Sequence, residues 1–194
     1  TTSVEILAHY SVAFTLATMT TMFSAAMTQS LLPAFSQLLG RERQDQLNSL
    51  FSRALRLNLI VMLPLLIGLF VLARPLFTVW AGPEFGREST SPFYVLLCGL
   101  FFNILAFVPA SLVLASGRTG LLAKLYWLEL GPYIVVIAIF TSAFGAVGAA
   151  AAWSVRAIAD AFLIAMISRR TLGTQFRIFE SRPSSIIPGF AVMA

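Results

Sequence analysis

Three ionisable residues stand inside long apolar stretches: Glu129, Arg156 and Asp160. Arg156 and Asp160 are four residues apart, so on a helix they share one face and can pair along it. An arginine suits a phosphate, because its planar guanidinium offers two parallel charge-assisted hydrogen bonds. A carboxylate suits a cation or a proton, and it can equally hold the arginine in place. Since a lone Arg or Asp at the centre of a membrane helix costs roughly 2.5–3.5 kcal/mol, we expect this face to look into a helix bundle or a water-filled cavity.

Two interpretations of these charges stay open. In the first, a salt bridge among Arg156, Asp160 and Glu129 fixes the packing of helices. In the second, a hydrophilic cavity meets a charged substrate or a coupling ion, either a proton or sodium. Further candidates for the cavity are Lys124, Asn58 and Asn103. Hydrogen bonds between helices would explain the two asparagines equally well.

Another group of basic residues is expected at the level of the lipid headgroups. Arg118 lies in "LASGRTG", between two apolar stretches, and Arg169 and Arg170 follow the last long one. Contact with lipid phosphates is the interpretation that we adopt for them, with substrate access as the second possibility for Arg118.

The composition indicates whether the chain folds in water or in a membrane. Hydrophobic residues make up 58% of the 194 residues and charged residues only 11%, whereas soluble domains carry about a quarter charged residues. We therefore predict a membrane protein. The net charge of +5 does not indicate a nucleic-acid partner, because the basic residues are scattered between apolar runs. The chain has one histidine, one cysteine and no recognisable catalytic or phosphate-binding motif, so we expect no enzyme, no metal site and no cofactor.

The apolar stretches have the length of membrane-spanning helices. A helix needs about 20 residues to cross the hydrocarbon core, and the runs are continuous rather than alternating, which excludes barrel strands. We predict an all-α polytopic bundle in residues 1–168, then a basic cytoplasmic connection at 169–185 and the start of a truncated helix at 186–194. The five predicted crossings cover about residues 10–38, 54–73, 92–115, 121–144 and 146–168. Both ends look cut, so we expect a fragment of a larger protein.

The basic residues also predict the orientation of the bundle. Arg41, Arg43, Arg53, Arg56, Arg118, Lys124, Arg169, Arg170, Arg177 and Arg182 fall on the first and third connections and the tail. Only Arg74 and Arg87 fall on the opposite side. Because cytoplasmic loops are enriched in Lys and Arg, the first group is expected to be cytoplasmic and the start of the chain outside.

Several stretches resemble one family in their order and spacing. They are "HYSVAFTLATM", "LLPAFSQL", "RALRLNLIVMLPLLIGL", "VWAGPEF", "LASGR" and "FGAVGAAAAWSVRAIADAFL", which together cover about residues 9–168. In these features the chain resembles the C-terminal lobe of polysaccharide-biosynthesis flippases, the Wzx-like branch of the multidrug/oligosaccharidyl-lipid/polysaccharide exporter superfamily.

This resemblance implies a function and a set of partners. Such flippases have two lobes around a central cavity and move undecaprenyl-pyrophosphate-linked oligosaccharides across the bacterial inner membrane by alternating access. It implies that Arg156 neutralises pyrophosphate or an acidic sugar, that Asp160 or Glu129 couples the cycle to an ion, and that an N-terminal lobe is missing here. Two alternatives stay open: a multidrug or metabolite exporter of the same superfamily, and a non-transport assembly partner in the membrane.

Overall fold

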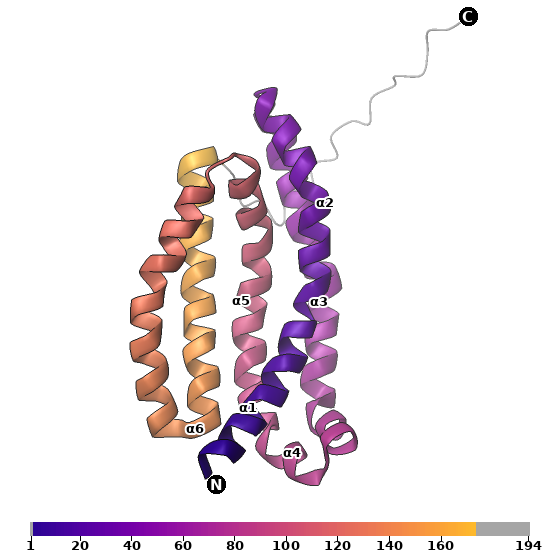
Figure 1. Ribbon diagram of the computed structural model, residues 1–194. Coiled ribbons are helices and arrows are strands. Elements are labelled where there is room, and N and C mark those ends of the chain that lie inside the picture. Colours follow the sequence, from indigo (N-terminus) through magenta and orange to yellow (C-terminus); the bar gives the residue numbers. More distant parts are fainter. Residues whose placement is uncertain (1, 174–194) are drawn as a thin grey trace, which may run out of the picture.

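The computed structural model describes residues 2–173, which form helices joined by short turns (Figure 1). In chain order the helices are α1 (Thr2–Met19), α2 (Thr21–Gly40), α3 (Gln44–Ala81), α4 (Pro83–Glu88), α5 (Thr90–Ala115) and α6 (Thr119–Leu172). No strand occurs in this part of the chain, which confirms the predicted all-α class. Three helices, α3, α5 and α6, are long and apolar enough to cross a membrane. The chain is thus a multi-pass membrane protein.

The first apolar stretch is divided into two helices at Thr20. Its hydroxyl donates to the carbonyl of Ala17 at 2.6 Å, and the hydroxyl of Thr21 donates to that of Thr18 at 2.7 Å. Threonine hydroxyls offer the backbone partners that compete with the regular helical pattern. The sequence "ATMTTM" thus marks the junction of two helices where one unbroken crossing was predicted.

Helix α3 is longer than the crossing predicted inside it. Its 38 residues span about 57 Å at 1.5 Å per residue, roughly twice the thickness of the hydrocarbon core. The residues from Gln44 up to the predicted second crossing belong to the same helix, and Leu47 and Phe51 are buried there against Phe35 of α2. At the other end Gly82, with φ 104°, turns the chain into the short helix α4.

Helix α6 is a hairpin of two arms, not a straight rod (Figure 1). Gly145 has φ 57° and ψ −130°, a conformation that glycine alone adopts readily. The chain reverses there, so that residues 119–144 form the first arm and residues 146–172 the second. Gly148 then sits against the carbonyl of Phe140, where a side chain would collide with backbone. The two glycines make a turn with almost no loop.

Helix α5 lies at the centre of the bundle and packs against each of the other helices (Figure 1). Phe93, Leu96 and Leu100 on α5 are fully buried in a core shared with α1, α3 and the second arm of α6. Gly99 lets that arm approach closely, and the Ser154 hydroxyl donates to the carbonyl of Val95 at 2.8 Å. Small residues at such contacts are the usual means of close packing between membrane helices.

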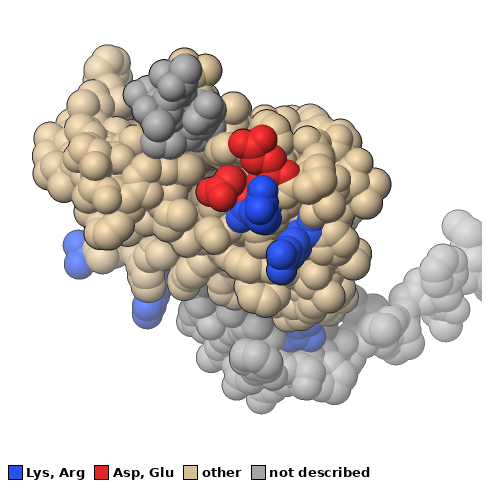
Figure 2. All heavy atoms as spheres, turned by 90° about the horizontal axis from the view of Figure 1, so that it is seen from below, with Lys and Arg blue, Asp and Glu red and all other residues tan. Residues whose placement is uncertain are grey.

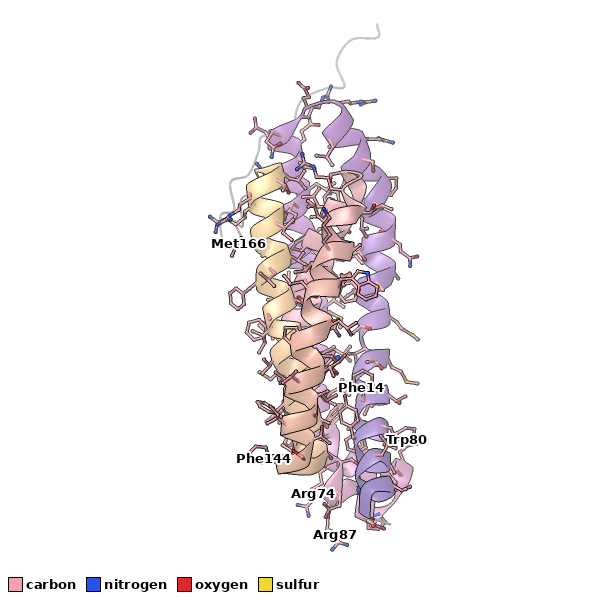
Figure 3. All side chains as sticks on the ribbon, turned by 60° about the vertical axis from the view of Figure 1, so that its left-hand side comes forward. Phe14, Arg74, Trp80, Arg87, Phe144 and Met166 are labelled. Atoms are coloured by element: carbon pink, nitrogen blue, oxygen red, sulfur yellow. The ribbon has the colours of Figure 1, made fainter. Side chains whose placement is uncertain are left out.

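The connections gather at two ends of the bundle. At one end Gln44 Nε2 donates to the carbonyl of Leu172 at 2.8 Å, so the start of α3 meets the end of α6. At the other end lie Arg74 and Arg87 (Figure 3). Seen from below, the described surface shows one mixed group of basic and acidic side chains and further basic side chains near its edge, on an otherwise uncharged surface (Figure 2).

The end of α6 differs from the predicted boundary. Arg169 and Arg170 form the last helical turn instead of opening a connection, and Gly173, with φ 63°, follows the end of the helix. Basic residues are favoured there because the C-terminus of a helix carries partial negative charge, and a left-handed glycine is a common helix stop. The rest of the predicted connection and the predicted further helix at 186–194 lie outside the described residues.

Candidate functional site

The intramembrane charges meet across the α6 hairpin. Arg156 on the second arm forms an ion pair with Glu129 on the first arm, with 3.6 Å between Nε and Oε2. Of the three residues in the predicted salt bridge, Arg156 and Glu129 pair between the arms, and within residues 2–173 Arg156 makes no such pair with Asp160. A cation that precedes its carboxylate by four residues is in the less favourable of the two helical orders, which is consistent with this arrangement.

Both carboxylates are buried and have spare acceptor atoms. The Glu129 side chain and Asp160 are each 8% exposed. Both oxygens of Glu129 and Oδ1 of Asp160 have no hydrogen-bond partner among the described residues. The contact to Arg156 is too long to count as a hydrogen bond. Because an unsatisfied buried carboxylate is costly, the site is suited to accept a donor or a cation.

The charged cluster opens into a groove between the two arms. A cavity of about 260 Å³ is lined by Leu128, Glu129, Pro132, Tyr133, Val136, Ala152, Val155, Arg156, Ala159 and Leu163. Its volume is sufficient for several water molecules. The guanidinium of Arg156 lies 5.2 Å from the centre of the Tyr133 ring, and the side chain is 38% exposed. Arg156 is thus held between an acid and an aromatic ring at the edge of an apolar groove, and part of its side chain is exposed.

Aromatic residues that the sequence reasoning did not select lie next to this site. Phe14 on α1 packs edge-to-face on Trp153, with ring centres 5.7 Å apart, and Tyr10 stacks on Phe14 at 5.6 Å. Figure 3 shows Phe14 between α1 and the α6 hairpin. Two of these residues stand in the aromatic stretch "HYSVAF". That stretch does not reveal that α1 packs beside Trp153, which follows Phe14 by 139 positions.

Asn58 has the structural role that was the alternative to the cavity. It is 1% exposed at the junction of α2, α3 and α5. Its Oδ1 accepts a hydrogen bond from the Ser24 hydroxyl at 2.8 Å, and its Nδ2 donates to the Ile104 carbonyl at 2.9 Å. The side chain therefore joins three helices and does not line the groove.

The other candidates lie away from the charged cluster. Asn103 is half-buried on α5 and Lys124 is exposed on the first arm of α6, and neither lines the groove. Arg118 is exposed in the turn between α5 and α6, and Arg169 and Arg170 are exposed at the end of α6. In the described part of the chain, no group of three metal-binding side chains comes together.

Comparison with known proteins identifies the family. The whole chain, residues 1–194, matches the family described as "Lipid II flippase MurJ". The chain belongs to this family. The resemblance to lipid-linked oligosaccharide flippases found in the sequence is thereby confirmed.

Two curated relatives agree with this membership. A putative O-antigen transporter of Shigella flexneri is 32% identical over 119 residues, which cover 61% of this chain and 28% of that protein. A probable low-salt glycan biosynthesis flippase, Agl15, of Haloferax volcanii is 27% identical over 146 residues, which cover 74% of this chain and 30% of that protein. The chain therefore spans less than a third of the length of these relatives. No solved structure matches the chain significantly.

Proposed function

We propose that this chain is the C-terminal lobe of a flippase that moves lipid-pyrophosphate-linked oligosaccharides across the bacterial inner membrane by alternating access. Family membership and the names of the two relatives support the class of transporter and of cargo. In this proposal a second, N-terminal lobe completes the cavity, and surface polysaccharide synthesis consumes the flipped product.

The observation that carries the proposal is the position of Arg156. Its guanidinium is anchored by Glu129 and Tyr133, and its side chain borders the groove between the arms of α6 and remains partly exposed. A fixed arginine in an otherwise apolar groove is suited to bind a pyrophosphate through paired hydrogen bonds. Glu129 would keep the guanidinium in position when no substrate is bound. The lipid tail would stay in the bilayer while the charged headgroup passes Arg156.

In this proposal the buried carboxylates couple transport to the binding of an ion. Glu129 and Asp160 have acceptor atoms without partners beside Arg156. A proton or a sodium ion bound there would compensate their negative charge and weaken the hold of Glu129 on Arg156. In this way ion binding and release would change how strongly Arg156 attracts a phosphate.

Substitution at the ion pair tests this function in the complete transporter. A strain that lacks its own copy would carry Arg156→Ala, Arg156→Lys or the paired change Glu129→Met with Arg156→Met. We expect Arg156→Ala and the paired change to lower surface glycan more than tenfold at unchanged amounts of membrane protein, with partial retention in Arg156→Lys because the charge remains. Arg87→Ala, at the outer end of the bundle, is the control and should leave glycan unchanged.

The same variants separate transport from a purely structural role. If Arg156 and Glu129 only braced the hairpin, the paired apolar change would preserve both fold and glycan. Normal glycan in that variant would therefore overturn the role proposed for Arg156.

The excess of carboxylates over arginine in the cluster supports one second candidate, an exporter of soluble cationic compounds. Under that function, Glu129→Gln and Asp160→Asn would increase sensitivity to cationic drugs and leave surface glycan unchanged. Loss of glycan without a change in drug sensitivity would reject it.

A further inference from the structure

A second groove lies on the bundle apart from the charged site. Between α3, α5 and the second arm of α6 is a cavity of about 170 Å³, and it shares no lining residue with the groove that contains Arg156. Its lining consists only of apolar side chains: Leu55, Phe102, Leu105, Pro109, Ala161, Phe162 and Ala165. Such a space offers no partner for a sugar or a phosphate. It fits a hydrocarbon chain.

The apolar groove continues toward the end of α6. Phe162 lies at its mouth, 63% exposed, with its ring centre 6.3 Å from that of Phe102. Phe162 and Ala165 are followed along the second arm by Met166, Arg169 and Arg170, which stand at helical spacings of three and four residues. These residues therefore form one strip of surface, a path that leads from the apolar groove to the end of the arm. Met166 lies on the outer side of this arm (Figure 3).

Two arginines stand at the end of this path. Arg169 follows Phe162 by seven residues, which is about two helical turns or 10 Å, so both lie on one face of the arm. Arg169 and Arg170 are exposed, and no carboxylate of residues 2–173 forms an ion pair with either. By the distribution of basic residues this end faces the cytoplasm, where the membrane surface is negatively charged. The path therefore runs from two arginines that pair with no carboxylate of residues 2–173 into an apolar slot.

We infer that this path binds one anionic phospholipid of the cytoplasmic leaflet. Its phosphate contacts Arg169 and Arg170, and one acyl chain lies along Met166 and Phe162 into the slot between α3 and α6. A headgroup with net negative charge is preferred over a zwitterionic one, because no carboxylate of residues 2–173 pairs with the arginines and could complement an ammonium group. The site is separate from the Arg156 groove, with which it shares no lining residue.

Native mass spectrometry of the complete transporter in detergent tests this site. The protein is titrated with phosphatidylglycerol and, separately, with phosphatidylcholine of the same acyl chains. We expect tight binding of one phosphatidylglycerol, and about 30-fold weaker binding in Arg169→Gln with Arg170→Gln, because each arginine near a membrane surface contributes about fivefold. The matched control, Arg74→Gln with Arg87→Gln at the outer end, should bind as the unchanged protein does.

A second variant tests the apolar slot without any change of charge. Ala165→Leu fills the space next to Phe162 and should weaken phosphatidylglycerol binding at least fivefold while the helix content measured by circular dichroism stays the same. If that variant does not fold, the paired arginine change decides alone. Unchanged binding after the arginine change, equal binding of both phospholipids, or displacement of phosphatidylglycerol by an equimolar polyprenyl pyrophosphate would each overturn the inference, the last by assigning the path to the substrate.

Discussion

Replacing Gly99 by alanine is expected to push α5 away from the second arm of α6. A Cβ at this position would lie 2.6 Å from the Cα of Ser154, whereas carbon atoms in contact are normally about 3.5–4.0 Å apart. The obstacle is backbone, so it cannot rotate away as the end of a flexible side chain would. The two helices would have to separate by about 1 Å, and the hydrogen bond from Ser154 to Val95 would lengthen or break.

The expected cost follows from these two losses. Overpacking in a well-packed contact costs about 1–3 kcal/mol, and an interhelical hydrogen bond in a membrane protein contributes about 0.6–1.7 kcal/mol. We therefore expect Gly99→Ala to lower the free energy of unfolding of the complete transporter by about 2–4 kcal/mol. Ser154 is two residues from Arg156, so surface glycan should fall as well.

Titration of helix content with sodium dodecyl sulfate in mixed micelles measures this change. Gly68→Ala on α3 is the matched control, because a Cβ there would meet no atom within 4 Å. It should change the free energy of unfolding by less than about 1 kcal/mol, the usual difference between alanine and glycine in a helix. Equal effects of the two substitutions would show that the close contact between α5 and α6 is not formed in the membrane.

Two further substitutions, tested in the same titration, change an interhelical hydrogen-bonded contact and the turn of the hairpin. Asn58→Leu removes both hydrogen bonds that join α2, α3 and α5, and it should cost about 1–3 kcal/mol. Asn103→Leu should cost less than about 0.5 kcal/mol, and equal costs would contradict the role of Asn58. Gly145→Ala forces a side chain into the positive-φ turn of the hairpin and should cost about 1–3 kcal/mol; a neutral result would mean that the arms are joined differently.

The helical class and the apolar segments could be predicted because the hydrocarbon core of a membrane favours apolar side chains along the whole length of a spanning helix. A spanning helix must satisfy its own backbone, and composition over about 20 residues is enough to reveal it. The break at Thr20 and the extension of α3 to Ala81 were missed, because hydropathy is averaged over a window and does not record where a hydroxyl bonds or where a helix leaves the hydrocarbon.

The residue types of the candidate site follow from the sequence more directly than the geometry that joins them. Charge inside an apolar stretch selected Glu129, Arg156 and Asp160, and the structure places all three on α6. Their spacing suggested a pair within one helix, whereas the ion pair crosses the hairpin. The sequence shows that Arg156 and Asp160 share a face, but only packing decides which neighbouring helix presents a partner. The same limit applies to Phe14, which reaches Trp153 from the far end of the chain.

The turn at Gly145 has a consequence for how this lobe can move. Because one residue joins the two arms, with Gly148 seated against Phe140, there is no spare length that would let one arm slide past the other. The two arms of the hairpin must therefore rotate or tilt together, as one rigid body, relative to the other helices. In the proposed transport cycle Glu129 and Arg156 would then move together, and a change in the cavity would come from the contacts of the hairpin with other helices such as α1.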